Sequence, residues 1–101
     1  MDSMTYAYDA TLLVLDDHAI EVFRRLVAGS QRIPLMWAGA TLKPKRGEEI
    51  QVQVGITANA SDPFYSESVI GSGAYVFSIL QSEEAALRSF LDEAARRGHR
   101  A

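Results

Sequence analysis

The sequence predicts an α+β fold that is mostly β, in which antiparallel strands form a barrel or curled sheet and one C-terminal helix closes it. Three observations lead to this prediction. Short apolar segments separated by turn residues run from residue 6 to residue 80. Residues 50–57 alternate between apolar and polar side chains, as a half-buried strand does. Residues 82–98 place apolar side chains at helical spacing.

Six strands are expected from the apolar segments, at residues 6–15, 19–26, 32–42, 50–57, 64–70 and 74–80. The run Asp16-Asp17-His18 predicts a tight hairpin between the first two, because short polar side chains tolerate left-handed backbone and bond locally. Pro34 has no backbone donor, which places it at a strand start or on a sheet edge. The glycines and the remaining prolines mark the later turns.

The helix over residues 82–98 is expected to be part of the core. Ser82 is the predicted N-cap, and Gly98 suits the C-terminal end. One apolar stripe is formed by Leu87, Phe90, Leu91 and Ala94. Spacing of four residues predicts ion pairs of Glu84 with Arg88, Asp92 with Arg96, and Glu93 with Arg97. Burial of the larger stripe residues contributes roughly 5 to 8 kcal/mol, so truncation before the helix should unfold the chain.

A chain of 101 residues is the usual size of one domain, and we expect residues 1–101 to form one, with 1–5 and 98–101 frayed. Apolar residues make up 48% and charged residues 23%, which is typical of a globular chain rather than a disordered one. The net charge of −3 provides no basic face for a polyanionic backbone, so no nucleic-acid partner is expected.

The cellular location is inferred from what the sequence lacks. It has no cysteine, so disulfides and thiolate chemistry are excluded, as in many proteins of a reducing compartment. The first four residues lack the basic and apolar regions of a signal peptide. No apolar run is long enough for a membrane-spanning helix. We therefore expect a cytoplasmic protein.

The order of many antiparallel strands followed by one closing helix, with apolar patterns at residues 31–35, 50–54, 74–77 and 90–94, resembles the pleckstrin-homology-like superfamily. The similarity covers residues 6–97 and is to small bacterial members, including actinobacterial families of unknown function. Members have seven strands, so the resemblance implies a sheet of six to seven. It also implies a non-catalytic module that binds a protein partner or a second copy of itself. Such binding uses a strand edge or the groove between the closing helix and a neighbouring strand.

Basic residues predict an alternative function. Pleckstrin-homology domains that bind phosphoinositides use basic residues of the first hairpin loop, but residues 16–18 are largely acidic. Lys43, Lys45 and Arg46 form another basic cluster, which makes a peripheral binder of anionic lipid or anionic ligand the alternative. Three such charges contribute roughly 3 kcal/mol near an anionic surface, too little for stable anchoring. The cluster also fits a solvated hairpin tip that discourages aggregation.

We expect no enzymatic activity, no cofactor and no metal. His18 and His99 are the candidate acid–base groups. His99 lies near the C-terminal end, and His18 sits beside two aspartates in a tight turn, where neighbouring residues seldom converge on one ion. The serines lack the glycine-flanked elbow of a hydrolase. The Gly-Ser-Gly run at 71–73 is too short to hold a phosphate.

The aromatic residues predict core packing or a binding surface. Large rings dominate small cores, and those expected inside are Trp37, Tyr75, Phe77 and Phe90. Phe64 and Tyr65 fit the same core or, alternatively, a surface patch that anchors a partner peptide. If Tyr65 and Glu67 lie on an exposed strand edge, a second copy of the chain can pair there, which predicts a homodimer.

Overall fold

The structure, a computed structural model, describes residues 3–59, 61–67 and 69–99 and confirms a mostly β fold with a C-terminal α-helix. In chain order the elements are β1 (Met4–Tyr8), β2 (Thr11–Leu15), β3 (Ala19–Arg24), β4 (Gln31–Pro34), β5 (Ala38–Pro44), β6 (Glu49–Ile56), β7 (Ile70–Leu80), the short 3₁₀ helix η1 (Gln81–Glu83) and α1 (Glu84–Arg97). The alternating segment predicted at residues 50–57 is β6, with Ile50, Val52 and Val54 buried.

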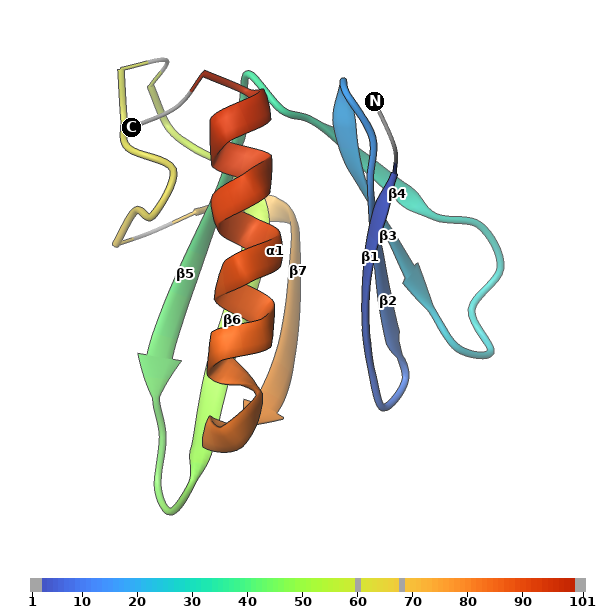
Figure 1. The fold of residues 1–101 in the computed structure, drawn as a ribbon, viewed down its shortest axis with the longest axis vertical. Coiled ribbons are helices and arrows are strands. Elements are labelled where there is room, and N and C mark those ends of the chain that lie inside the picture. The colour runs from blue at the N-terminus through green and yellow to red at the C-terminus, as the bar shows by residue number, and fades with distance from the viewer. Residues whose placement is uncertain (1–2, 60, 68, 100–101) are drawn as a thin grey trace.

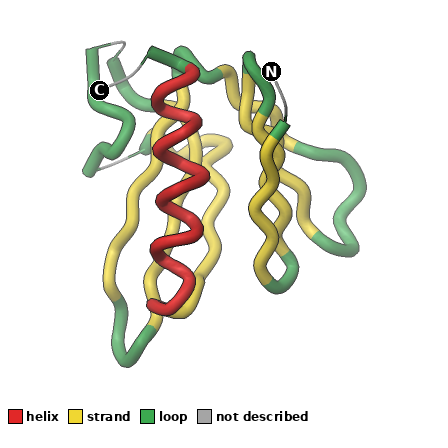
Figure 2. The backbone as a smooth tube through the Cα atoms, viewed as in Figure 1, coloured by secondary structure: helices red, strands yellow, loops and turns green. Residues whose placement is uncertain are grey.

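The strands form two antiparallel sheets (Figure 1). The first sheet has the order β1-β2-β3-β4 and the second has the order β5-β6-β7. Over the described ranges no ladder joins the two sheets, so the expected barrel is replaced by a pair of open sheets. α1 contacts β1 of the first sheet and β5 of the second, and the tube view shows the loops at the ends of the strands (Figure 2). The helix therefore covers the space between the sheets.

The predicted first strand is two strands. β1 and β2 form a hairpin in which Tyr8 lies opposite Thr11, with Asp9 and Ala10 at the turn. Asp9 has a φ of +53°, a left-handed conformation that aspartate tolerates. The strand begins at Met4, within the segment that was expected to be frayed.

The predicted strand over residues 32–42 is also two strands, and they belong to different sheets. After β4 the chain turns, and the N–H of Trp37 donates to the C=O of Pro34 at 3.0 Å. Leu35 is buried within this turn, but Trp37 is 52% exposed. The predicted burial of Trp37 is wrong, because its position belongs to a turn and not to the inner face of a strand.

The strand predicted at residues 64–70 is absent, and Ile70 is instead the first residue of β7. Phe64 is completely buried, and Tyr65 forms an isolated parallel bridge with Ala40 of β5. Two of the six predicted strands are thus each divided in two and one is lost. Seven strands result in the described part of the chain.

The helix is confirmed, although its N-terminal cap is not. Ser82 lies in η1, and neither η1 nor α1 has a side-chain capping hydrogen bond. At the other end the N–H of Gly98 bonds to the carbonyl of Ala94, as expected for a terminating residue. All members of the predicted apolar stripe are buried: Leu87, Phe90, Leu91 and Ala94.

Two of the three predicted ion pairs on α1 are present. Glu84 accepts from Arg88 at 2.8 Å, and Glu93 accepts from Arg97 at 2.8 Å. Arg96 pairs with Glu93 and not with Asp92. Both arginines on Glu93 lower the pKa of its carboxyl to about 2, with the hydrogen bond from Arg96 as the larger cause.

The core lies between the two sheets and α1. The largest side chains that are completely buried are Phe64, Phe90, Leu13, Leu15, Ile20, Ile33, Ile79, Leu87, Leu91, Val52 and Val54. Phe90 is therefore in the core as predicted, while Tyr75 and Phe77 are only partly buried against it. Among the described residues, no helix is long and apolar enough to cross a membrane.

Candidate functional site

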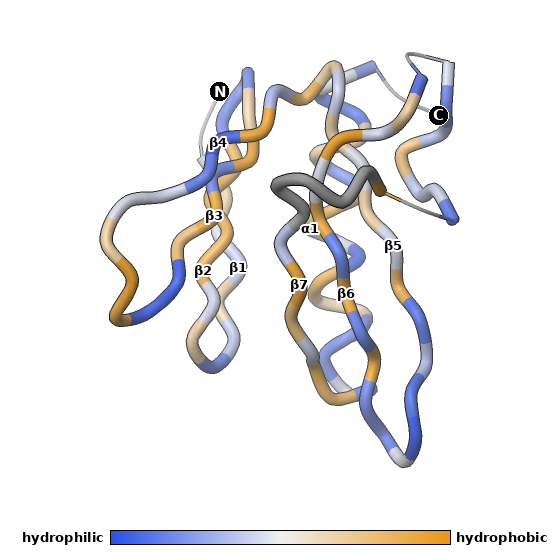
Figure 3. Tube along the Cα trace, turned by 180° about the vertical axis from the view of Figure 1, so that it is seen from behind, coloured by the Kyte–Doolittle hydropathy of each residue, from blue (hydrophilic) through white to orange (hydrophobic). Residues whose placement is uncertain are grey.

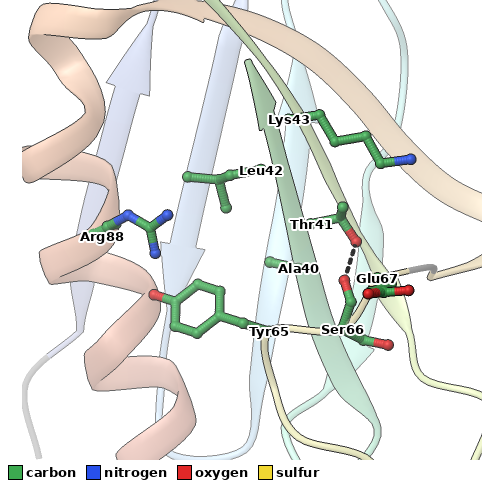
Figure 4. A pocket seen from close by; sticks show the side chains of 8 residues that line it. All are labelled: Ala40, Thr41, Leu42, Lys43, Tyr65, Ser66, Glu67 and Arg88. Atoms are coloured by element: carbon green, nitrogen blue, oxygen red, sulfur yellow. Dashed lines mark hydrogen bonds between the residues drawn. The ribbon is translucent and has the colours of Figure 1, made fainter.

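A groove lies between the outer edge of β5 and α1. It encloses about 460 Å³. We call it the β5–α1 groove, and it is lined by Ala40, Thr41, Leu42, Lys43, Tyr65, Ser66, Glu67 and Arg88 (Figure 4). This is the place, between the closing helix and a neighbouring strand, that the resemblance implied for binding.

The segment after β6 forms one end of the groove. The N–H of Ala40 donates to the carbonyl of Phe64 at 2.9 Å, and the N–H of Ser66 donates to the carbonyl of Ala40 at 3.2 Å. The Thr41 hydroxyl donates to the carbonyl of Ser66 at 2.6 Å. Because Phe64 is buried beneath this contact, the segment is anchored to the core and fixes where the open edge of β5 begins.

Tyr65 and Arg88 form the wall on the helix side. The Tyr65 hydroxyl donates to Oδ1 of Asp92 at 2.6 Å, and the guanidinium of Arg88 lies over the Tyr65 ring at 5.3 Å. Burial and the Asp92 carboxylate both raise the pKa of Tyr65, so its hydroxyl stays neutral and keeps donating. Nε of Arg88 also donates to Glu84 at 2.8 Å. These contacts hold both side chains in place without a ligand.

The open edge of β5 presents backbone groups next to this wall. The N–H and C=O of Ala40 point away from β6, toward Phe64 and Ser66. Because strand residues alternate, the N–H and C=O of Leu42 point the same way. Among the described residues neither group of Leu42 has a backbone partner on that side. Pro44 is the next outward position and has no N–H, so it ends the run of donors.

A second hollow continues the groove toward the start of α1. It encloses about 210 Å³ and shares Leu42 and Arg88 with the first. Its other walls come from the β5–β6 hairpin and the start of the helix: Pro44, Lys45, Gly47, Glu49, Ile50, Gln81 and Glu84. The two hollows are neighbours beside the edge of β5, and we call them together the channel.

The predicted site residues are distributed unevenly around this channel. Lys43 and Tyr65 line the groove itself, and Lys45 lines its continuation. Arg46 is exposed on the β5–β6 hairpin but lines neither hollow. Phe64 is completely buried and offers no surface to a partner. Its placement agrees with the core alternative and excludes it from a surface patch.

Sequence reasoning did not find Arg88 as a site residue. Its spacing from Glu84 was interpreted only as an ion pair on a solvent-exposed helix face, and that pair is present. A signal was nevertheless available, because Arg88 follows the buried Leu87 and so borders the packed stripe of the helix. A side chain at that border of a helix face is close to whatever covers the face.

The loop at residues 16–18 connects β2 to β3 and is the second hairpin loop, not the first. Oδ1 of Asp16 accepts from the backbone N–H groups of His18 and Ala19 at 2.7 and 2.8 Å. The hydrogen bond from the His18 amide is the largest cause of the lowered pKa of Asp16. Across the ranges that the structure describes, no group of three or more potential metal ligands gathers.

Comparisons with protein-family models, with curated proteins and with solved structures find no match to this chain.

Proposed function

We propose that this protein is a non-catalytic interaction module that binds an extended segment of a partner protein in the β5–α1 groove. The supporting observation is the outward-facing N–H and C=O of Leu42, which lie beside a preformed channel. An incoming strand would satisfy both groups and add to the second sheet. Its side chains would alternate between the channel and solvent.

The charges of the groove indicate what such a segment would carry. In the β5–α1 groove Lys43 and Arg88 carry positive charge, with Arg88 paired to Glu84, while Glu67 places negative charge at the end closed by residues 64–66. A segment with an acidic residue near Leu42 and a basic one near Glu67 would complement both ends. Because backbone pairing is limited to a short stretch before Pro44, side-chain contacts would supply most of the selectivity.

The pleckstrin-homology-like resemblance is part of this proposal. Seven described strands followed by one terminal helix match the number of strands and the order of elements that the resemblance implied. A homodimer through Tyr65 and Glu67 receives less support, because the bridge between Tyr65 and Ala40 already covers the β5 edge at that point. Only the stretch beyond it, at Leu42, remains for pairing.

The test is a selection of short random peptides against the purified chain, followed by mapping of the enriched peptides by backbone amide chemical shifts. We expect the largest shift changes at Leu42, Lys43 and in the first half of α1. Arg88→Ala should weaken the selected peptides about 5- to 50-fold, as loss of a well-placed charged contact does.

Arg96→Ala is the matched control, because Arg96 lies on the same helix and also donates to a carboxylate, yet lines neither hollow of the groove. It should leave peptide affinity unchanged. The proposal fails if no peptide is enriched, if the shift changes fall on the other sheet, or if the two arginine variants bind equally well.

A further inference from the structure

The outward face of the first sheet carries an apolar row beside the β3–β4 turn. The register places Ala7 of β1 opposite Leu12 of β2, and Leu12 opposite Phe23 of β3. Leu13 is completely buried, so by the alternation of strand residues this row points away from the core. Ala7 is exposed, and Leu12 is 37% exposed. The sheet thus presents apolar side chains on the face where an antiparallel sheet usually presents polar ones.

The next outward row of the same sheet is different in character. It consists of Thr5, Val14, Glu21 and Arg32, which lie opposite one another on the four strands. All but Val14 are polar, and Arg32 pairs with Glu21 at 3.7 Å and with Asp16 at 3.1 Å. The apolar surface is therefore confined to the row beside the turn and is bordered by polar residues, as the centre of a protein interface is.

A hollow of about 340 Å³ is lined by the apolar row, and we call it the outer hollow. The rest of its wall comes from the β1–β2 turn and the start of the β3–β4 turn, including Asp9 and Arg25. The N–H of Arg25 donates to the carbonyl of Ala10 at 2.8 Å, which joins the two turns. Neither Asp9 nor Arg25 forms an ion pair within the described part of the chain. The outer hollow thus has one anion and one cation on its wall that do not pair with each other.

Leu26 directly follows Arg25 and projects from the molecule. The N–H of Val27 donates to the carbonyl of Arg24 at 3.1 Å, which closes a four-residue turn that contains Leu26. Leu26 is 100% exposed, and its φ of +66° lies in the left-handed region, where a leucine is strained and a glycine or asparagine is not. Figure 3 shows the β3–β4 loop at the margin of the molecule, with an apolar stretch beside a hydrophilic one. An apolar projection therefore stands next to an apolar hollow.

We propose that two copies of this chain associate about a two-fold axis through this surface, with Leu26 of each copy in the outer hollow of the other. In this arrangement Leu26 contacts the partner's Leu12 and the partner's Phe23 and loses its exposure to water. Arg25 of each copy faces the partner's Asp9 at the rim of the hollow. Each contact is made twice, as a two-fold axis requires.

A second copy is the occupant that the surface itself supports. One chain carries both the projection and the hollow, and both the cation and the anion, so the surface is complementary to itself in apolar character and in charge. The surface has fewer residues than the roughly 20 to 30 a side of a standard interface, so we expect a weak dimer. It is separate from the β5–α1 groove, and the proposal does not depend on peptide binding there.

The test is sedimentation equilibrium of the full chain from about 10 µM to about 1 mM, which covers weak association. We expect the mass to rise toward that of a dimer and to stop there. Backbone amide shifts recorded over the same range should change at Leu12, Phe23 and Leu26. A chain that stays monomeric at the highest concentration overturns the proposal. So does a mass that grows past the dimer, or a set of shift changes confined to the β5–α1 groove.

Leu26→Asn should raise the dissociation constant of the dimer about 10- to 30-fold, because it replaces the apolar anchor. Asparagine tolerates the left-handed φ, so the variant should stay folded, which circular dichroism checks. The matched control is Met36→Gln, which removes an apolar side chain that is 63% exposed in the turn between β4 and β5. It should leave the dissociation constant unchanged. The proposal is overturned if Leu26→Asn associates like the parent, or if Met36→Gln weakens association as much.

Arg25→Gln should raise the dissociation constant about three- to tenfold, because an exposed ion pair is lost twice in each dimer. Arg96→Gln is its control, since it removes the same charge from the C-terminal end of α1, which lies away from this turn in Figure 1. It should not raise the dissociation constant. Equal effects of the two variants would show a dependence on net charge alone and would overturn the contact between Arg25 and the partner's Asp9.

Discussion

The inner face of α1 and the β3–β4 turn carry similar apolar side chains in opposite surroundings. On α1, Leu87, Phe90 and Leu91 are buried between the two sheets. In the turn, Leu26 and Val27 face solvent, and Leu26 does so with a left-handed backbone. Burial makes the helix residues stabilising, while the turn residues contribute no burial to the fold. The difference separates residues that stabilise the structure by burial from residues that the fold leaves at the surface.

The largest expected effect on stability comes from a substitution on the buried face of α1. Phe90 is 2% exposed, and its ring centroid lies 6.5 Å from that of Tyr6 on β1. Phe90→Ala should lower the free energy of unfolding by about 3 to 5 kcal/mol, because the lost burial adds to the cavity left behind. Domains of this size are typically stable by about 5 to 15 kcal/mol, so the variant would be marginal. Urea unfolding followed by circular dichroism measures the change.

Ser89→Ala is the control for that measurement, because Ser89 is adjacent but lies on the exposed face of the same helix. It should change the free energy of unfolding by less than about 0.5 kcal/mol. A loss below about 1 kcal/mol for Phe90→Ala would contradict the central place given to the helix in the core.

A second, smaller effect on stability distinguishes the β2–β3 turn from the β3–β4 turn of the same sheet. Asp16 suits the β2–β3 turn, since its carboxylate accepts from two backbone N–H groups and pairs with Arg32 at 3.1 Å. Asp16→Ala should cost about 1 kcal/mol, a value kept low because the side chain is 41% exposed and solvent screens the ion pair. If the urea midpoint of Asp16→Ala is unchanged, the choice of residue at position 16 affects stability no more than the choice of residue in the β3–β4 turn does.

The same carboxylate makes stability depend on pH. The pKa of Asp16 is lowered in the folded chain, chiefly by the hydrogen bond from the His18 amide, so the unfolded chain binds its proton at a higher pH. Stability from Asp16 is therefore present above pH 4, roughly the unfolded pKa, and is lost as pH falls further. Urea midpoints between pH 5 and pH 2.5, about the range in which carboxylates titrate, should fall more steeply for the parent than for Asp16→Asn. The pKa of Glu93 is also lowered, so Glu93 makes the urea midpoint fall with pH in both the parent and Asp16→Asn. Parallel curves of midpoint against pH for the two proteins would therefore contradict the role of Asp16.

Elements with one clear periodicity were predictable from the sequence. The alternation in β6 and the stripe on α1 both reflect a single buried face, and both are present. The turn between β4 and β5 was missed because its residues, Leu35 to Trp37, are apolar and contain no glycine. Trp37 was consequently expected inside. The β1–β2 turn was missed because one aspartate was its only turn signal.

The location of the candidate groove was predictable, but most of its lining was not. The resemblance implied a groove beside the closing helix, and Lys43 and Tyr65 were chosen for their charge and ring. The role of Leu42 depends on which backbone groups face outward, which is a matter of register with β6. Register between segments distant in sequence is set by tertiary packing and leaves no local pattern to detect.

The smallest expected effect is that of a substitution in the β3–β4 turn. Unlike the substitutions above, it should not lower the free energy of unfolding. Leu26→Gly relieves the left-handed strain, although glycine also gives the unfolded chain more freedom. The two terms partly cancel, so the free energy of unfolding should stay equal or rise by up to about 1 kcal/mol. Removing a leucine from α1 would lower it by several times that amount. A loss above about 1 kcal/mol for Leu26→Gly would mean that Leu26 supports the fold despite its exposure.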